Sequence, residues 1–441
     1  MKISGFRELT PNQRFAEKQF LQIIENTFSL YGFESIETSS AQSASDLLAK
    51  GETSKEIYLL SRLQGVENNK ADINLESEKQ LGLRFDQTIP LANYIYQFSN
   101  DIIFPFRAYQ IGKVWRGERA QAGRFREFTQ ADIDIISSST LTITDEIECI
   151  LTVAKAFKKL ENLGCPPITI NINNRKIIES YYKYIGIENV NSVLQIVDKL
   201  PKIGEDGVID QLQKVNAEGE KPLDKNAAKK IVDFTHFDLQ TLESDKEFFT
   251  FLSSSSEYSS TIEEFKNMKN LISQINKLRF ENVKLDFSIA RGLDYYTGLV
   301  FETFLEGFES LGSVCSGGRY DNLVKKGNTV YQGIGASIGL TRLLYILFEN
   351  SSLKTQGKTA ADTFIILDSE NDRQAALCIA EVLRNRGIST IISPKANKYG
   401  KQIEMAQKLG IKYVWFLSPE LEIKNIITGE QKKADPKTWM P

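Results

Sequence analysis

Two β-prone stretches joined by a polar loop constrain the fold of this chain most strongly. The stretches are FRAYQIGKVWR, residues 106–116, and REFTQADIDII, residues 126–136, and the loop between them is GERAQAGRF. Runs of β-branched and aromatic residues on either side of a short polar loop predict a long antiparallel hairpin. We therefore expect an antiparallel sheet at the centre of the fold.

The length of the chain argues for several domains. A chain of 441 residues is too long for one hydrophobic core, so two to four domains are expected. With 41% hydrophobic and 25% charged residues, the composition is that of an ordinary globular protein. The N-terminus lacks a signal-peptide core and no apolar run approaches the length of a membrane span, which predicts a cytoplasmic protein without membrane contact.

Cysteine and histidine usage excludes several chemistries. The cysteines Cys149, Cys165, Cys315 and Cys378 lie far apart, without metal-ligand or disulfide-scaffold spacing, and are interpreted as buried thiols. His236 is the only histidine, which excludes mechanisms that need a catalytic triad with histidine or a histidine-rich metal site.

The net charge of −3 neither requires nor excludes a nucleic-acid partner, because local clustering of charge decides whether a protein binds nucleic acid.

Periodicity divides the chain into regions. Apolar residues at helical spacing predict a helix over 15–31, SIETSS (35–40) predicts a short strand, 141–163 predicts a helix and 168–172 a strand. Residues 174–277 have helical periodicity without a further strand pattern. Within them SSSSEYSS (253–260) is interpreted as an exposed connection, and Ser260 with Glu263 as the capping box of the next helix.

Strand patterns return after residue 277 and end in the glycine-punctuated segment GIGASIGLTRLLYILFE. A small polar linker then precedes strand–helix alternation typical of a small α/β domain. The predicted domains are a first part of the catalytic domain (1–173), a helical insertion (174–277), a second catalytic part (278–350), a linker (351–362) and a C-terminal domain (363–441).

Three arginines beside glycines or strand ends are candidates for a shared polyanion site: Arg116, Arg291 and Arg342. Each alone is most often a structural ion-pair residue, but a guanidinium suits phosphate oxygens well. The sequence contains neither a P-loop nor a dinucleotide-binding glycine motif. A bound nucleotide would therefore be held on a sheet by side chains.

The quoted hairpin resembles motif 2 of class II aminoacyl-tRNA synthetases in its histidyl-tRNA synthetase form. RGLDYYTGLVFE and CSGGRYDNLV resemble the two signature segments of that family, and GIGASIGLTRL resembles motif 3. The resemblance also includes LRFDQTIPLANYI and IVDKLPKIGED, and extends over essentially the whole length. It implies an α/β protein with an α+β catalytic core: a class II antiparallel sheet with flanking helices, a helical insertion and a C-terminal α/β anticodon-binding domain.

The resemblance also implies roles for residues of this chain. ATP would lie on the sheet, with Arg116 and Arg291 as catalytic residues at the α-phosphate, Arg342 at the γ-phosphate, Phe128 stacked on adenine and Glu118 at its edge. Mg²⁺ is expected on the pyrophosphate, with ligands that no motif identifies. For histidine, Asp86, Thr88 and Gln130 would hold the amino and carboxylate groups, Asp134 and Tyr296 the imidazole, and Tyr295 and Tyr320 would line the pocket.

The implied second substrate is histidine tRNA. Its acceptor end would meet Arg119, Gln121 and Arg124 in the motif 2 loop. Between Arg384 and Lys412 the C-terminal segment carries seven basic residues and a single acid, which suits contact with an anticodon stem, although such runs are usually solvated faces. A homodimer is also implied.

Several positions depart from the family pattern, among them Asp86 and Asp134, which are aspartates where some members have glutamates. Ser39 stands where motif 1 has a proline, the loop RAQAGR lacks a proline after its first arginine, and Thr341 precedes the motif 3 arginine in place of an acid. The rival interpretations are a non-catalytic paralogue that senses histidine as a regulatory subunit of ATP phosphoribosyltransferase, and a generic nucleotide-binding protein. The paralogue predicts loss of the phosphate arginines and of the C-terminal domain, both of which are present.

Overall fold

The computed structural model describes residues 3–48, 56–61, 80–214, 222–280, 282–289, 296–350, 353 and 359–441. These form two compact units, one made of Met1–Arg7 and Ile23–Ser352 and the other of Glu8–Gln22 and Leu353–Pro441. Helix α1, Pro11–Leu30, belongs in part to each. Its buried residues Ile24 and Phe28 confirm the apolar stripe predicted for 15–31, and the Phe28 ring lies 5.7 Å from that of Tyr109.

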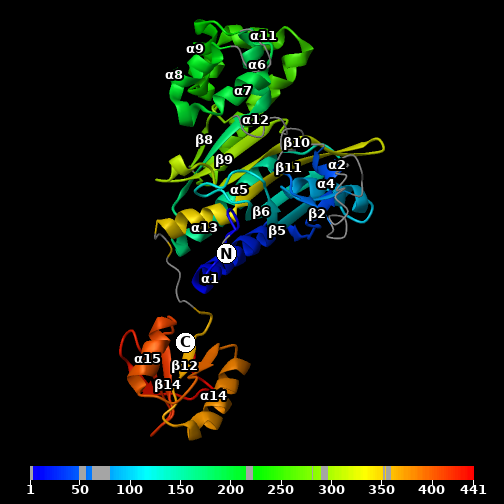
Figure 1. Cartoon of the computed structure of the whole chain (residues 1–441). Helices are drawn as coiled ribbons and strands as arrows, with labels where there is room; N and C mark the ends of the chain where they lie inside the picture. The colour runs from blue at the N-terminus through cyan, green and yellow to red at the C-terminus, as the bar shows by residue number, and fades with distance from the viewer. Residues whose placement is uncertain are drawn as a thin grey trace. The chain divides into compact units, whose positions relative to one another are not determined.

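An eight-stranded sheet forms the centre of the first unit (Figure 1). All neighbouring strands are antiparallel except the parallel pairs at its two edges, β1 with β5 and β7 with β8. The predicted antiparallel fold class is confirmed. In spatial order the strands are β1 (Glu34–Ser35), β5 (Phe106–Trp115), β6 (Glu127–Ser137), β11 (Thr329–Gly339), β10 (Cys315–Lys326), β9 (Leu299–Leu305), β7 (Ile168–Asn174) and β8 (Val283–Leu285).

Strands β5 and β6 form the predicted hairpin. They pair continuously from Phe106 opposite Ile136 to Trp115 opposite Glu127. Side chains alternate between the two faces of a strand, so Ala131 and Ile133 of β6 share one face. Both are at most 1% exposed, which shows that this face is core. The polar residues between them lie on the opposite face.

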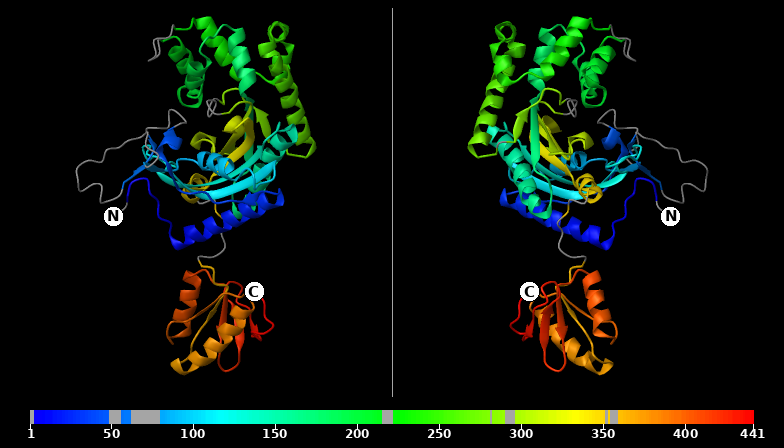
Figure 2. Two further views of the ribbon diagram at one scale, coloured as in Figure 1. Left: turned by 90° about the vertical axis from the view of Figure 1, so that its right-hand side faces the viewer. Right: turned by 90° about the vertical axis from the view of Figure 1, so that its left-hand side faces the viewer.

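Helices and a second small sheet flank the central sheet. Helix α5 begins with a capping box between Thr142 and Asp145 and buries Ile150, Val153 and Phe157. The other elements here are β2 (Ala41–Ser43), α2 (Ala44–Leu48), β3 (Leu59–Leu60), β4 (Leu81–Leu83), α4 (Thr88–Phe98), α5 (Ile143–Leu160), η2 (Glu161–Leu163), η3 (Glu309–Leu311) and α13 (Leu340–Glu349). Figure 2 shows the central sheet to be curved.

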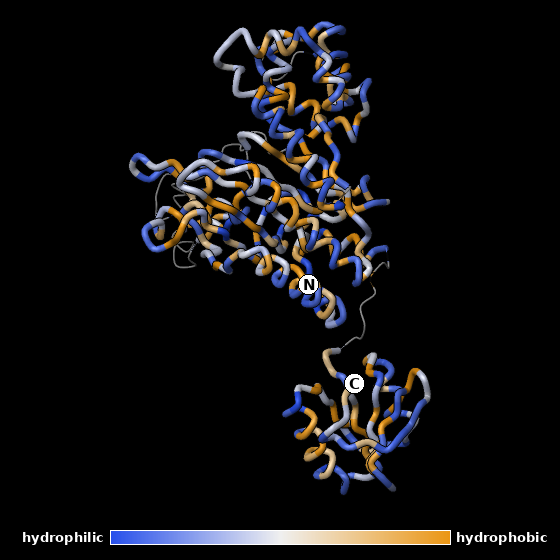
Figure 3. The backbone as a smooth tube through the Cα atoms, turned by 180° about the vertical axis from the view of Figure 1, so that it is seen from behind, coloured by the Kyte–Doolittle hydropathy of each residue, from blue (hydrophilic) through white to orange (hydrophobic). Residues whose placement is uncertain are grey.

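In the described part of 174–277, seven helices gather beyond the β8 edge of the sheet (Figure 1). Their apolar stretches alternate with polar ones, as Figure 3 shows, and meet in an aromatic core. In it the ring of Phe234 stacks on Tyr181 at 4.0 Å and on Phe287 at 4.5 Å. The helices are α6 (Arg175–Tyr184), α7 (Val190–Val197), α8 (Leu200–Leu212), α9 (Lys225–Thr235), α10 (Leu239–Ser244), α11 (Lys246–Ser253) and α12 (Ser256–Lys277).

Two local predictions were wrong. Helix α12 already begins at Ser256, so Ser260 lies inside it and no capping box with Glu263 starts there. The sequence at the start of α12 is rich in serine, which favours turns and caps over helix interiors. The Tyr258 ring stacks on Phe251 at 4.7 Å, and this contact stabilises the first turn of the helix. In SIETSS only Ser35 is in a strand, because β1 ends at that residue.

The second unit contains a five-stranded sheet. Phe364 and Val414 pack on one face and Ile365 and Trp415 on the other, so the central strands β12 and β14 are buried on both sides. Trp415 is fully buried and is a core residue of this unit. In spatial order the strands are β13 (Thr390–Ile392), β12 (Thr363–Ile365), β14 (Tyr413–Phe416), β15 (Glu422–Asn425) and β16 (Gln431–Lys433), with η4 (Glu370–Asp372), α14 (Arg373–Asn385) and α15 (Tyr399–Lys408).

Candidate active site

A cavity of about 750 Å³ opens on the polar face of the central sheet. Its walls come from the segment before α4, the β5–β6 hairpin, strands β9, β10 and β11, the start of α13, and two insertion residues, Asp198 and Lys202. Residues far apart in sequence are thus brought together. Among the residues proposed from sequence, the cavity is lined by Asp86, Thr88, Arg116, Glu118, Arg124, Phe128, Gln130, Tyr296 and Arg342.

The remaining sequence candidates lie elsewhere. Asp134 and Tyr320 are buried beside the cavity and do not line it. Arg119 and Gln121 are exposed in the hairpin loop. Arg291 and Tyr295 lie outside the described residues.

Arg116 is held at the end of β5 with its charge over an aromatic ring. Its Nε donates to the carbonyl of Phe85 at 3.1 Å, and its guanidinium carbon lies 5.2 Å from the centre of the Phe128 ring. A cation at this distance from a ring is attracted to it. These contacts fix the direction of Arg116 in the cavity and leave it able to bind an anion with its terminal nitrogens.

The hairpin loop folds back toward helix α13. Arg124 pairs with Glu118 at 3.5 Å, so two sequence candidates neutralise each other in part. Gly123 is buried with a φ of 73°, and a Cβ atom there would lie 3.7 Å from Cγ of Arg342. Glycine adopts this left-handed conformation without strain, which lets the loop approach α13 closely.

The start of α13 is fixed by two contacts to other segments. Arg342 donates to the carbonyl of Leu311. The Thr341 hydroxyl accepts the backbone N–H of Thr129 at 2.8 Å, which ties α13 to β6. The hydroxyl that stands where the family pattern often has an acid therefore joins two elements of the cavity wall.

Asp86 and Gln130 present polar groups at the other end of the cavity. Oδ1 of Asp86 accepts the backbone N–H groups of Thr88 and Ile89, both at 3.1 Å. Nε2 of Gln130 donates to the Ser337 hydroxyl at 2.8 Å, while its buried Oε1 has no hydrogen-bond partner. The amide oxygen of Gln130 is thus available to a ligand.

The Tyr320 hydroxyl donates to Oδ1 of Asp134. Tyr320 faces Gly333 across the β10–β11 pair, and a Cβ atom on Gly333 would collide with its ring. The ring of Tyr296 packs on Gly318, where a Cβ atom would lie 2.7 Å from its Cδ1. Burial, followed by the charge of Asp134, raises the pKa of Tyr296, which keeps its hydroxyl protonated as a donor.

Asp132 is a cavity residue that the sequence reasoning missed. It is 6% exposed and lies on β6 between Gln130 and Asp134. Burial raises its pKa to about 7, with a further contribution from the negative charge of Asp86. The alternation in QADIDI was a usable signal, because it places all three side chains on one face if one of them faces the site.

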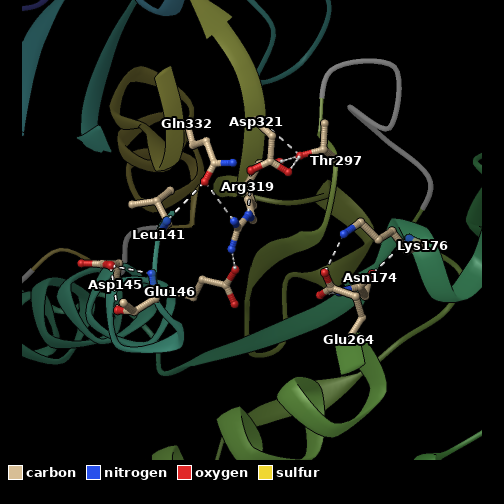
Figure 4. A network of polar contacts seen from close by, with 11 residues as sticks. Leu141, Asp145, Glu146, Asn174, Lys176, Glu264, Thr297, Arg319, Asp321 and Gln332 are labelled. Carbon is tan, nitrogen blue, oxygen red and sulfur yellow. Dashed lines mark hydrogen bonds and ion pairs between the residues drawn. The ribbon is translucent and has the colours of Figure 1, made fainter. Parts of the chain in front are cut away.

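A polar network supports the segment that carries Tyr296 (Figure 4). The Thr297 hydroxyl donates to Oδ2 of Asp321 at 2.6 Å, and its backbone N–H donates to the Arg319 carbonyl at 2.8 Å. Arg319 in turn donates to Asp321 at 2.9 Å and to Glu146 of α5 at 3.1 Å. The residue next to Tyr296 is therefore bound through β10 to a helix on the flank of the sheet.

A neighbouring set of contacts joins the insertion to the sheet. Lys176 pairs with Glu264 of α12 at 2.7 Å, and Asn174 at the end of β7 donates to the same carboxylate at 3.0 Å (Figure 4).

Over the residues that the structure describes, no three histidine, cysteine or acidic side chains cluster as a metal site would require. Within the same residues, no helix combines the length and apolarity needed to cross a membrane.

Comparisons with known proteins agree on one family. The family model for histidyl-tRNA synthetase matches residues 5–343. The histidine–tRNA ligase of Bifidobacterium animalis subsp. lactis is 43% identical, covering 100% of this chain and 95% of its own. The crystal structure of histidyl-tRNA synthetase from Nostoc has a TM-score of 0.81 and 30% identity, covering 98% of this chain and 96% of that chain.

A structure from Bacillus halodurans, titled as an ATP phosphoribosyltransferase regulatory subunit/histidyl-tRNA synthetase, has a TM-score of 0.68. It is 20% identical, covers 92% of this chain and 96% of its own, and shares the fold alone. The fold and the full-length relatives define an aminoacyl-tRNA synthetase. Within that class, the chain belongs to the histidyl-tRNA synthetase family.

Proposed function

We propose that this histidine–tRNA ligase activates histidine with ATP in the cavity on the central sheet and then transfers it to histidine tRNA. The observation that carries the assignment to this cavity is the convergence on it of nine residues that motif resemblance had singled out from separate segments. The proposed products of the first step are histidyl-adenylate and pyrophosphate. Those of the second are histidyl-tRNA and AMP.

The first step needs no general base, since the histidine carboxylate is already a nucleophile at neutral pH. It attacks the α-phosphorus of ATP, a bond to the carboxylate oxygen forms, and pyrophosphate leaves. The chain then contributes positioning and charge stabilisation. We assign the α-phosphate to Arg116 and Arg291, the γ-phosphate to Arg342, and adenine to Phe128 and Glu118.

For histidine, the proposal assigns the amino and carboxylate groups to Asp86, Thr88 and Gln130. The imidazole is assigned to Asp134 and Tyr296, with Tyr295 and Tyr320 around it. The bond from Tyr320 to Asp134 supports this assignment, because it orients the carboxylate that would accept a ring N–H. A site built from hydrogen-bonding groups rejects apolar side chains of similar size, which would leave those groups unpaired.

Mg²⁺ would enter with the phosphates of ATP. Magnesium sites on nucleotides need only one or two protein carboxylates, and Glu302 lines the cavity as an oxygen ligand of this kind. The ion would neutralise phosphate charge.

The proposal also includes the tRNA contacts, the domains and the assembly. We assign the tRNA acceptor end to Arg119, Gln121 and Arg124, and the anticodon stem to the domain at 363–441. The catalytic parts at 1–173 and 278–350, the insertion at 174–277 and the linker at 351–362 belong to the same proposal. We also propose a homodimer, which light scattering after gel filtration would test.

The test is histidine-dependent exchange of pyrophosphate into ATP, with the other amino acids as controls. We expect exchange with histidine alone and its loss in Arg291→Ala and Arg116→Ala. Arg373→Ala is the matched control, because the contacts of Arg373 among the described residues are with Glu370 and the carbonyl of Pro394, both in the second unit. Histidine binding without exchange in the unmodified protein would refute the assignment and favour the regulatory paralogue.

A further inference from the structure

Two buried acceptors in the cavity lack hydrogen-bond partners. Asp132 and Gln130 stand two residues apart on β6, so both side chains lie on the face that bears the cavity. Oδ1 of Asp132 and Oε1 of Gln130 are buried and make no hydrogen bond. An unsatisfied buried acceptor destabilises a fold, so acceptors kept open in a cavity are suited to donors from a ligand.

The surroundings of Asp132 favour a cationic donor. Ser337 and Gln87 lower its pKa by hydrogen bonding and Arg116 by its charge, but burial and the charge of Asp86 outweigh them. These neighbours therefore stabilise the ionised carboxylate of Asp132 by less than burial and Asp86 destabilise it. A ligand with a positive charge would add the missing stabilisation of the ionised form.

Among the residues that the structure describes, the other titratable groups around Asp132 do not supply that charge. Arg84 is attracted to it but donates to the carbonyls of Lys113 and Thr38, at 2.9 Å each. Tyr296, which precedes β9, and Cys315 of β10 are neutral groups near it, because burial raises the pKa of both. The carboxylates of Asp86 and Asp132 thus line one cavity, and Oδ1 of Asp132 is a buried acceptor without a hydrogen bond.

We infer that Asp132 is a further binding residue for the α-ammonium group of histidine, an inference that rests on the proposed function. Asp86, Gln130 and Asp132 then present three acceptors to the three N–H donors of an ammonium group. Asp134 and Tyr296 remain with the imidazole at the far end of the same strand face. Asp132 thereby selects a substrate with a free amino group.

Binding should be coupled to a proton. With a pKa of about 7, Asp132 is protonated in about half of the free molecules at neutral pH. An adjacent ammonium group favours the ionised carboxylate, so the proton leaves Asp132 for the solvent as the ligand binds. No covalent bond changes in this step.

The experiment compares three ligands by calorimetry on the unmodified protein and on Asp132→Asn. L-Histidine and L-histidinol carry the ammonium group, and imidazolepropionate carries the ring without it. Losing a charge-assisted bond should weaken the first two ligands by about 10- to 100-fold and leave the third within about 3-fold. The proton released by histidine at neutral pH, read from buffers of different ionisation enthalpy, should disappear in the variant.

Each other outcome overturns the inference. An equal loss for all three ligands would place Asp132 at the shared ring or show a structural role, and no loss would show no contact. Failure of the unmodified protein to bind histidine would instead refute the proposed function. Binding of histidine with no effect of Asp132→Asn would refute this inference alone.

A second measurement needs no variant. Infrared difference spectra of the unmodified protein, taken slightly below neutral pH, should lose a protonated carboxyl band when histidinol binds. Histidinol has no carboxyl group, so the band reports the protein. Glu146, whose pKa is also raised to about 7, lies with Arg319 outside the cavity lining and should not respond to the ligand. An unchanged band would overturn the inference.

Discussion

Replacing Glu146 by glutamine should stabilise the protein at alkaline pH and leave its stability nearly unchanged at acid pH. Glu146 is 7% exposed and bonds to Arg319 at 3.1 Å. Burial raises its pKa from 4.5 to about 7, although Arg319 lowers it. The folded state therefore binds this proton more tightly than the unfolded chain does, so the stability that Glu146 contributes is complete below pH 4.5 and is lost as the pH rises through 7.

The size of the effect follows from the two pKa values. Their difference, about 7 minus 4.5, corresponds to about 3 kcal/mol, because one pKa unit is worth about 1.4 kcal/mol. Glutamine resembles the protonated acid and keeps an acceptor for Arg319. The variant should thus match the unmodified protein near pH 4.5 and exceed its free energy of unfolding by about 3 kcal/mol above pH 7.

Urea unfolding at the two pH values, followed by tryptophan fluorescence, measures this difference between the proteins. Glu263→Gln is the control. Its pair with Lys266 is exposed and spans 4.0 Å, so its removal should change stability by less than about 1 kcal/mol at either pH. A difference between Glu146→Gln and the unmodified protein that does not grow from acid to alkaline pH would refute the reasoning.

Three further outcomes are expected. Gly333→Ala should displace the Tyr320 ring and raise the KM for histidine in pyrophosphate exchange with little change in the KM for ATP, and equal changes would contradict this. Thr297→Val removes the bonds to Asp321 and should cost about 2 kcal/mol in urea unfolding and raise the KM for histidine, whereas Thr297→Ser should restore both. Lys401→Gln should lower the salt dependence of tRNA binding by about one charge without affecting pyrophosphate exchange, and an unchanged slope would argue against a tRNA contact there.

The sequence predicted the parts of the fold that local patterns determine. The hairpin of β5 and β6 was predictable because its residue pattern is long and regular. Helix α14, Arg373–Asn385, and the buried β14 were predictable for the same reason. Strands β15 and β16 were not predicted, because EIKN and QKK are short and charged and owe their strand form to pairing with β14 and with each other.

Contacts across long sequence separations could not be predicted from patterns. Alternation alone does not decide which face of β6 Asp134 occupies, and the hydrogen bond that it accepts from Tyr320 spans 186 residues. The interpretation of the cysteines as buried thiols was correct for three of them and wrong for Cys378, which is exposed on α14. Which face of α14 is buried depends on how the helix packs on the sheet, and that packing is a tertiary property. Periodicity alone therefore does not tell whether Cys378 faces the core or the solvent.

The order of residues along β6 explains how one sheet can serve two chemically different ends of a site. Phe128, Gln130, Asp132 and Asp134 occupy every second position and share a face. At about 3.4 Å per residue, this row spans about 20 Å, from Arg116 near Phe128 to the carboxylate beside Tyr296. One face of β6 therefore carries groups for both ends of the site, and Arg116 at the end of the neighbouring β5 adds the cationic group beside Phe128.

Packing of the apolar face of β6 also fixes the positions of the binding groups on its polar face. The residues between these four, among them Ala131 and Ile133, are buried on the opposite face. A slip of one residue in the pairing of β6 would turn the acids into the core and the apolar residues into the cavity. The free energy that fixes the register of the hydrophobic face thus also fixes the position of every binding group on the polar face, which is why a cavity with unsatisfied acceptors can persist in a stable sheet.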